Sequence, residues 1–224
     1  MSHDLYREAH PLPFVITHWI NLCAMVFLTL SGFYIHYPIF GGFMGLARGA
    51  HIFLAFVLVI NLLVRLVMMF FVKDAIMPDT REVEKDYKNW LPQAANRHQL
   101  GPWVKYYLFL KKDHPISAKY GVLQKIAYVV TPFLILAAAY TGFCLWGPTS
   151  MWAFFYWGTV TIASLFKLGG GGDPMGVRIV HYWIMWVILI FTAAHAYLAN
   201  IYNFAPSAMI FTWKESVSEK HQNF

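Results

Sequence analysis

The sequence is poor in charged residues. Only 12% of its 224 residues are charged, whereas an average soluble domain carries roughly a quarter. Hydrophobic residues make up 58% of the chain, and the mean hydropathy is +0.49. This composition excludes an ordinary soluble domain and predicts a chain that is surrounded by membrane lipid. The length suits a single domain over residues 1–224.

Cysteine is also scarce, because Cys23 and Cys144 are the only two in the sequence. An iron–sulfur cluster is usually held by more thiolates than that, and two give no disulfide framework. Both lie in apolar runs, which predicts small buried core residues. The net charge is +6, but the basic residues lie between apolar runs. They are therefore predicted to set membrane topology rather than to bind nucleic acid.

Four apolar runs are long enough to cross a membrane. A helix needs roughly 20 apolar residues to span about 30 Å of hydrocarbon. Runs of this length cover residues 14–36, 49–72, 122–146 and 177–202. The third contains Pro132, which predicts a kink that packed helices can tolerate. We therefore predict an all-α fold, an integral membrane four-helix bundle.

A fifth apolar run covers residues 151–168 and is short and rich in aromatic residues. It follows Gly147-Pro148 and precedes the sequence GGGGDP. We predict an extra helix that lies in the membrane interface or packs under a partner. A fifth span is the alternative, and it would reverse the direction of the last helix.

The basic residues predict the topology. The loop 73–121 carries nine Lys and Arg residues, whereas the loop 37–47 carries none. The positive-inside rule places the basic loop in the cytoplasm. With four spans, both termini are cytoplasmic as well. The N-terminal segment is mixed in charge and lacks a small-residue cleavage site, so no signal peptide is expected. The predicted location is the inner (cytoplasmic) membrane.

Four of the ten histidines lie inside the apolar runs rather than in polar segments or at their edges, and an ionisable residue at membrane depth is a candidate functional residue. They are His18, His51, His181 and His195. The last two are fourteen residues apart, so they share one helix face and differ by about 21 Å in depth. With four spans, His51 and His181 lie near the outer face, and His18 and His195 lie near the inner face.

Neutral imidazole is a good axial ligand for haem iron. The depths predict two haems, one held by His51 and His181 and the other by His18 and His195. An iron with two histidine ligands has no open position, so it transfers electrons. Zinc fits less well, because each pair has too few ligands. Four unrelated histidines, each bonded to a neighbouring helix, are the structural alternative.

Two alternatives affect these pairs. His36 lies on the same face as His18 and could replace His51, but it is about 27 Å from His18. It also adjoins Tyr37-Pro38, where the helix should end. If residues 151–168 crossed the membrane, His18 would pair with His181 instead.

The last run has five residues at distinctive spacings: Arg178, His181, Trp186, Phe191 and His195. This pattern closely resembles that of the b-type cytochrome subunits of membrane-bound nickel–iron hydrogenases, and all five positions match. The resemblance extends over most of the chain. Between these positions, Ile179, Tyr182 and Trp183 depart from the usual residues, as does Val15 in the first run. Further stretches resemble the family, namely His18-Trp19, Ser31-Gly32 (for Thr-Gly), 62–65 and 106–110.

The wider superfamily includes the gamma subunits of respiratory formate dehydrogenases and thiosulfate reductase cytochromes, which have four spans and two haems. In the formate dehydrogenase type, a Tyr-Asn-x-Gly-Gln-Lys segment lies near the quinone. Tyr120, Gln124 and Lys125 match it, but Gly121 replaces the Asn that contacts quinone. The resemblance implies a quinone site at these residues.

The resemblance implies a single membrane cytochrome b domain with two haems b that passes electrons to menaquinone or ubiquinone. The implied partners are an iron–sulfur small subunit and a nickel–iron large subunit on the outer side, with membrane lipid around the helices. Arg65 pairs with a haem propionate or snorkels to the interface, and Arg178 could serve the outer haem. The alternatives are the same role for a formate dehydrogenase or sulfur-compound reductase, a free-standing cytochrome b561-like quinol oxidoreductase, and a transporter with histidine proton relays.

Overall fold

The computed structural model describes residues 6–8, 11–75, 83–91, 94, 98–112, 115, 121–167, 172–200 and 214–216. It divides into two compact units. The first unit contains residues 1–24, 60–129 and 196–224, and the second contains 25–59 and 130–195. The long helices contribute residues to both units.

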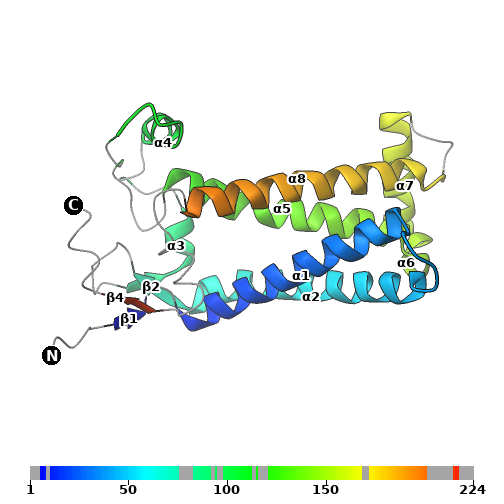
Figure 1. Ribbon diagram of the computed structural model, residues 1–224, viewed down its shortest axis with the longest axis horizontal. Coiled ribbons are helices and arrows are strands. Elements are labelled where there is room, and N and C mark those ends of the chain that lie inside the picture. Colours follow the sequence, from blue (N-terminus) through cyan, green and yellow to red (C-terminus); the bar gives the residue numbers. More distant parts are fainter. Residues whose placement is uncertain are drawn as a thin grey trace. The chain divides into compact units, whose positions relative to one another are not determined.

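Four helices in the described part of the chain are long and apolar enough to cross a membrane (Figure 1). They are α1 (Leu12–His36), α2 (Met44–Phe71), α5 (Val122–Leu145) and α8 (Met175–Asn200). The predicted all-α membrane bundle and its four spans are thus confirmed. The largest difference is at α2, which begins at Met44 instead of the predicted residue 49, because the helix continues through Gly45, Arg48 and Gly49.

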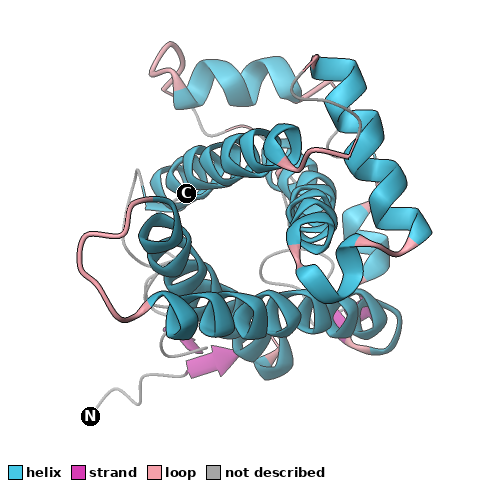
Figure 2. Cartoon of the chain, turned by 90° about the vertical axis from the view of Figure 1, so that its right-hand side faces the viewer, coloured by secondary structure: helices cyan, strands magenta, loops and turns pink. Residues whose placement is uncertain are grey.

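The second unit contains two short helices at the fifth apolar run. Helix α6 (Gly147–Ser150), with Pro148 near its start, precedes the run, and α7 (Ala153–Phe166) lies within it. Helix α7 crosses the ends of α5 and α8 rather than running beside them (Figures 1 and 2). The Tyr140 hydroxyl of α5 donates to the carbonyl oxygen of Phe154 at 3.1 Å, which ties α7 to α5.

Helix α5 runs through Pro132 without a break. Cys144, near the end of this helix, is buried, whereas Cys23 is exposed. The prediction of two buried thiols is therefore wrong for Cys23. An apolar run does not by itself show which of its faces is covered by protein, because lipid solvates the other face equally well.

The first unit contains short elements within the polar loop. Strands β2 (Lys73–Ala75) and β3 (Val83–Lys85) form an antiparallel pair with Asp74 opposite Glu84. Helices α3 (Tyr87–Trp90) and α4 (Leu100–Tyr107) follow. Strands β1 (Tyr6–Glu8) and β4 (Lys214–Ser216) form another antiparallel pair. The β2–β3 hairpin returns the chain to α2, where the Asp86 amide donates to the carbonyl oxygen of Val72 at 3.1 Å.

A buried amide joins α1 and α2 in the first unit. The side-chain nitrogen of Asn61, a residue only 5% exposed, donates to the carbonyl oxygen of Thr17 and to Oδ1 of Asn21, each at 2.7 Å. Interhelical hydrogen bonds of this kind stabilise membrane helices by roughly 0.6–2 kcal/mol.

We expect Asn61→Leu to lower the free energy of unfolding in detergent by about 1 kcal/mol, because both bonds disappear. Leu63→Ala on the same helix is the control, since Leu63 is 53% exposed. Its effect should stay within about 0.5 kcal/mol. Equal losses for the two variants would show that the amide contributes nothing specific.

Candidate functional site

The structure brings His51 and His181 together in the second unit. His51 lies in the first half of α2, and His181 lies near the start of α8. Their ring centroids are 6.3 Å apart, and the ring planes are inclined at 71°. Two imidazoles on opposite sides of one metal ion, each with a metal–nitrogen bond of about 2.0 Å, have ring centres about 6 Å apart. The observed separation therefore fits a shared metal ion.

Ser31 determines which ring nitrogen of His51 has a lone pair available to bind a metal ion. Its Oγ lies 2.9 Å from Nδ1 of His51 and 2.7 Å from the carbonyl oxygen of Phe27, one turn earlier in α1. A hydroxyl has a single proton to donate. Because the carbonyl group can only accept, Ser31 gives its proton to Phe27 and accepts the Nδ1–H of His51. The lone pair of His51 is then on Nε2.

Thr141 repeats this arrangement at His181. Its Oγ1 lies 2.8 Å from Nδ1 of His181 and donates to the carbonyl oxygen of Ala137 at 2.8 Å. The same argument places the proton of His181 on Nδ1 and its lone pair on Nε2. A metal-bound histidine typically donates its other ring N–H to such a partner, which fixes the tautomer. Both rings thus fit axial ligation of haem iron through Nε2.

A glycine follows each hydroxyl residue. A Cβ added at Gly32 would lie 3.4 Å from Cε1 of His51, and one added at Gly142 would lie 3.5 Å from Cε1 of His181. Each ring therefore lies against bare helix backbone. Sequence analysis included Ser31-Gly32 in the resemblance but missed the equivalent dipeptide at 141–142. A second Ser/Thr-Gly dipeptide inside an apolar run was the signal that could have revealed it.

His36 has different surroundings. Its ring stacks on Tyr182, with centroids 4.6 Å apart and planes inclined at 21°, and it meets the Tyr37 ring edge-on at 4.3 Å. A hydrogen bond with Tyr182 raises the pKa of Tyr37 above its ordinary value, because the bond favours the protonated phenol. The structure thus places His36 in an aromatic cluster, whereas His51 faces His181.

The other predicted pair is divided between the two units. His18 lies on α1 in the first unit, and His195 lies on α8 at the end of the second. Their pairing stays a prediction. Arg178, in the first turn of α8, is exposed.

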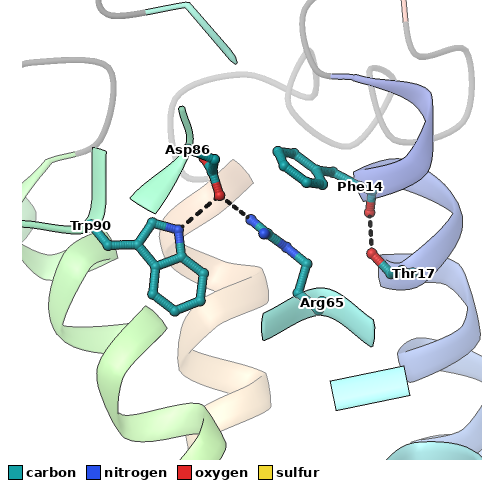
Figure 3. A network of polar contacts seen from close by, with 5 residues as sticks. All are labelled: Phe14, Thr17, Arg65, Asp86 and Trp90. Carbon is teal, nitrogen blue, oxygen red and sulfur yellow. Dashed lines mark hydrogen bonds and ion pairs between the residues drawn. The ribbon is translucent and has the colours of Figure 1, made fainter. Parts of the chain in front are cut away.

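Arg65 forms a buried ion pair in the first unit (Figure 3). Its Nη2 lies 2.8 Å from Oδ2 of Asp86, and the side chains are 13% and 0% exposed. The indole Nε1 of Trp90 donates to the same oxygen at 3.0 Å. The guanidinium also lies over the Phe14 ring, 3.8 Å from its centroid. Asp86, which sequence analysis missed, comes from the polar loop and neutralises an arginine in a membrane helix.

Two buried polar atoms of this ion pair remain to be accounted for. Nη1 of Arg65 and Oδ1 of Asp86 have no hydrogen-bond partner among the described residues. A buried polar atom of this kind calls for an explanation. An anionic group at Nη1 fits the chemistry of a guanidinium, which binds carboxylates through paired N–H groups.

The predicted quinone residues lie at the start of α5, except Tyr120, which is outside the described residues. Oε1 of Gln124 accepts from the Gly121 amide at 2.7 Å. Nζ of Lys125, a residue 7% exposed, donates to the carbonyl oxygen of Leu91 at 2.8 Å. A Cβ at Gly121 would lie 3.3 Å from the Trp103 ring. A larger residue here would press on the Trp103 ring.

Long apolar helices that bring two imidazoles face to face, each with its Nδ1–H held by a hydroxyl, fit a membrane b-type cytochrome that functions in electron transfer. The sequence comparison agrees with this class. The chain belongs to the family described as prokaryotic cytochrome b561, whose model matches residues 9–212.

The chain is also similar to two curated hydrogenase subunits. The probable Ni/Fe-hydrogenase 1 B-type cytochrome subunit of Escherichia coli (strain K12) is 25% identical over 223 residues, with 89% of this chain and 83% of the relative covered. The probable Ni/Fe-hydrogenase B-type cytochrome subunit of Azotobacter vinelandii is 27% identical over 203 residues, with 84% and 77% covered. The predicted resemblance is thereby confirmed.

Proposed function

We propose that this chain is a di-haem b subunit that carries electrons from a periplasmic-side nickel–iron hydrogenase to the quinone pool. The observation that carries the proposal is the facing of His51 and His181, each with its lone pair on Nε2. The names of the two relatives support a hydrogenase as the partner. Electrons would come from its iron–sulfur small subunit, which is bound to the nickel–iron large subunit.

We assign His51 and His181 to one haem, called the outer haem, and His18 and His195 to a second, called the inner haem. A haem with two histidine ligands supplies a one-electron centre with no open position for oxygen. Arg178 and Arg65 would each hold a haem propionate. The buried Nη1 of Arg65 supports the second assignment, because it has no partner among the described residues.

The quinone, menaquinone or ubiquinone, is proposed to bind at Tyr120, Gln124 and Lys125. Reduction to quinol takes two electrons and two protons. Lys125 supports this site, because it places an ammonium proton donor, bonded to the Leu91 carbonyl oxygen, in a mostly buried position. Gln124 would serve through its amide nitrogen, since its oxygen is bonded to the Gly121 amide.

His195→Ala tests the electron path. We expect this variant to lose about half of the haem b per chain and all quinone reduction, because the inner haem loses a ligand. The outer haem should still be reduced by the partner enzyme. Haem content and a rapid-mixing absorbance trace measure both effects. Intact quinone reduction would contradict the proposed quinone site on the inner-haem side.

The proposed location is the inner membrane, with both termini cytoplasmic and α7 at the interface. A reporter fused after Phe224 tests this topology. We expect a cytoplasmic reporter to be active there and alkaline phosphatase to be inactive, because four spans return the chain to the basic-loop side. Active phosphatase would overturn the orientation and with it the assignment of the outer and inner haem.

The family match also accommodates a free-standing cytochrome b561-like quinol oxidoreductase. Purification of the full chain from its native membrane in mild detergent distinguishes the two functions. A co-purifying iron–sulfur protein with a nickel–iron subunit supports the hydrogenase, and a formate dehydrogenase or sulfur-compound reductase would identify another partner. Isolation of the chain alone, with quinol oxidation retained, would favour the free-standing enzyme.

A further inference from the structure

We propose that Ser31 and Thr141 are positioning residues that hold the imidazole planes of His51 and His181 and thereby set the reduction potential of the iron between them. We call the two residues the hydroxyl clamp. The inference rests on the proposed function in one respect, namely that this iron belongs to the outer haem.

The clamp is anchored because each hydroxyl is fixed on its own helix. Ser31 donates to the carbonyl oxygen of Phe27 at 2.7 Å and lies 3.1 Å from that of Leu28. Its oxygen therefore has a defined position and accepts the Nδ1–H of His51 along one direction. Rotation of the ring about the metal–Nε2 bond would break this hydrogen bond.

The second half of the clamp is built in the same way. Thr141 donates to the carbonyl oxygen of Ala137 at 2.8 Å, lies 3.0 Å from that of Ala138 and accepts the Nδ1–H of His181. Gly32 and Gly142 lie against the Cε1 edges of the two rings. Each imidazole thus has a hydroxyl and the following glycine against one edge, at Nδ1 and Cε1.

The clamp has an electronic and a geometric consequence. An acceptor on Nδ1–H makes the imidazole more basic, and a more basic ligand stabilises ferric iron and lowers the reduction potential. The rings are held at 71° to each other. Imidazole planes that are nearly perpendicular give low-spin ferric haem a highly anisotropic electron paramagnetic resonance (EPR) signal, whereas parallel planes give an ordinary rhombic one.

The test uses Ser31→Ala, Thr141→Val and the double variant, in the full chain with both haems bound. We expect each single variant to raise the midpoint potential of the outer haem, and the double variant to raise it by about the sum. The inner haem should keep its potential. The highly anisotropic EPR signal should become rhombic in the double variant, because both rings can then rotate. The conservative variants Thr141→Ser and Ser31→Thr keep a hydroxyl and should therefore keep the native potential and EPR signal.

Thr29→Val is the matched control. Thr29 lies on the same helix as Ser31 and donates to the carbonyl oxygen of Met25 at 2.8 Å, but it bonds to no histidine ring among the described residues. Its removal should leave the potential and the EPR signal unchanged. Loss of the outer haem in the double variant, with the Thr29→Val protein fully loaded, would equally support the clamp.

Two failures can be told apart. If His51→Ala retains both haems, the proposed ligand pair is wrong and the proposed function fails with it. If His51→Ala loses the outer haem but the clamp variants match Thr29→Val in potential and EPR signal, the haem assignment stands and only the hydroxyl clamp is overturned.

Discussion

Replacing His181 by alanine should remove about half of the haem b and abolish electron transfer from the partner to quinone. The outer haem would lose one axial ligand, and Thr141 would lose the ring that it holds. His51→Ala should have the same effect, because the two rings face each other at 6.3 Å. Haem content and quinone reduction measured on the purified complex test this expectation.

His36→Ala is the control for this experiment. His36 lies inside the same unit but stacks on Tyr182, so both haems and most of the activity should remain. If His36→Ala lost a haem and His51→Ala did not, His36 would be the ligand on the first helix, and the role assigned to His51 would be wrong.

Replacing Asp86 by alanine should lower the free energy of unfolding by about 3 kcal/mol or more, because a buried charge loses its partner. The Asp86 side chain is fully buried and accepts from both Arg65 and Trp90. The variant removes the carboxylate that neutralises the guanidinium of Arg65, which stays buried beside Phe14. Denaturant titration in detergent measures the loss.

The double variant Arg65→Met, Asp86→Leu is the matched control. Apolar residues of similar volume often replace a buried ion pair at little cost in stability. We therefore expect the double variant to recover most of the stability that Asp86→Ala loses. If the two proteins were equally unstable, the contribution of Asp86 would come from its contacts with α3 rather than from its charge.

The four spans could be predicted from the sequence because length and hydropathy decide them almost alone. The start of α2 could not. Helix α2 continues to Met44 past two glycines, since backbone bonding extends beyond the apolar stretch that identified it. The β2–β3 hairpin and α3 were also missed, because a loop that is identified by its charge gives no information about its local pairing.

The candidate haem site could likewise be predicted only in part from the sequence. The depths of His51 and His181 followed from residue counting, because each turn of helix has a fixed rise. The hydroxyls of Ser31 and Thr141 could not be matched to these rings in the same way, because each lies on a neighbouring helix whose rotation the sequence does not reveal. Asp86 belongs by composition to a solvated loop, and only its tertiary contact with Arg65 explains its burial.

The ion pair between Arg65 and Asp86 also has a consequence for biogenesis. The two residues are 21 positions apart, so Arg65 is synthesised first. At roughly 5–20 residues per second, Asp86 follows after about 1–4 s. Until the loop has folded against α2, this helix carries an unneutralised arginine, which costs up to about 3 kcal/mol at the translocon. Stable insertion of the second span therefore depends on a loop that follows it in the chain.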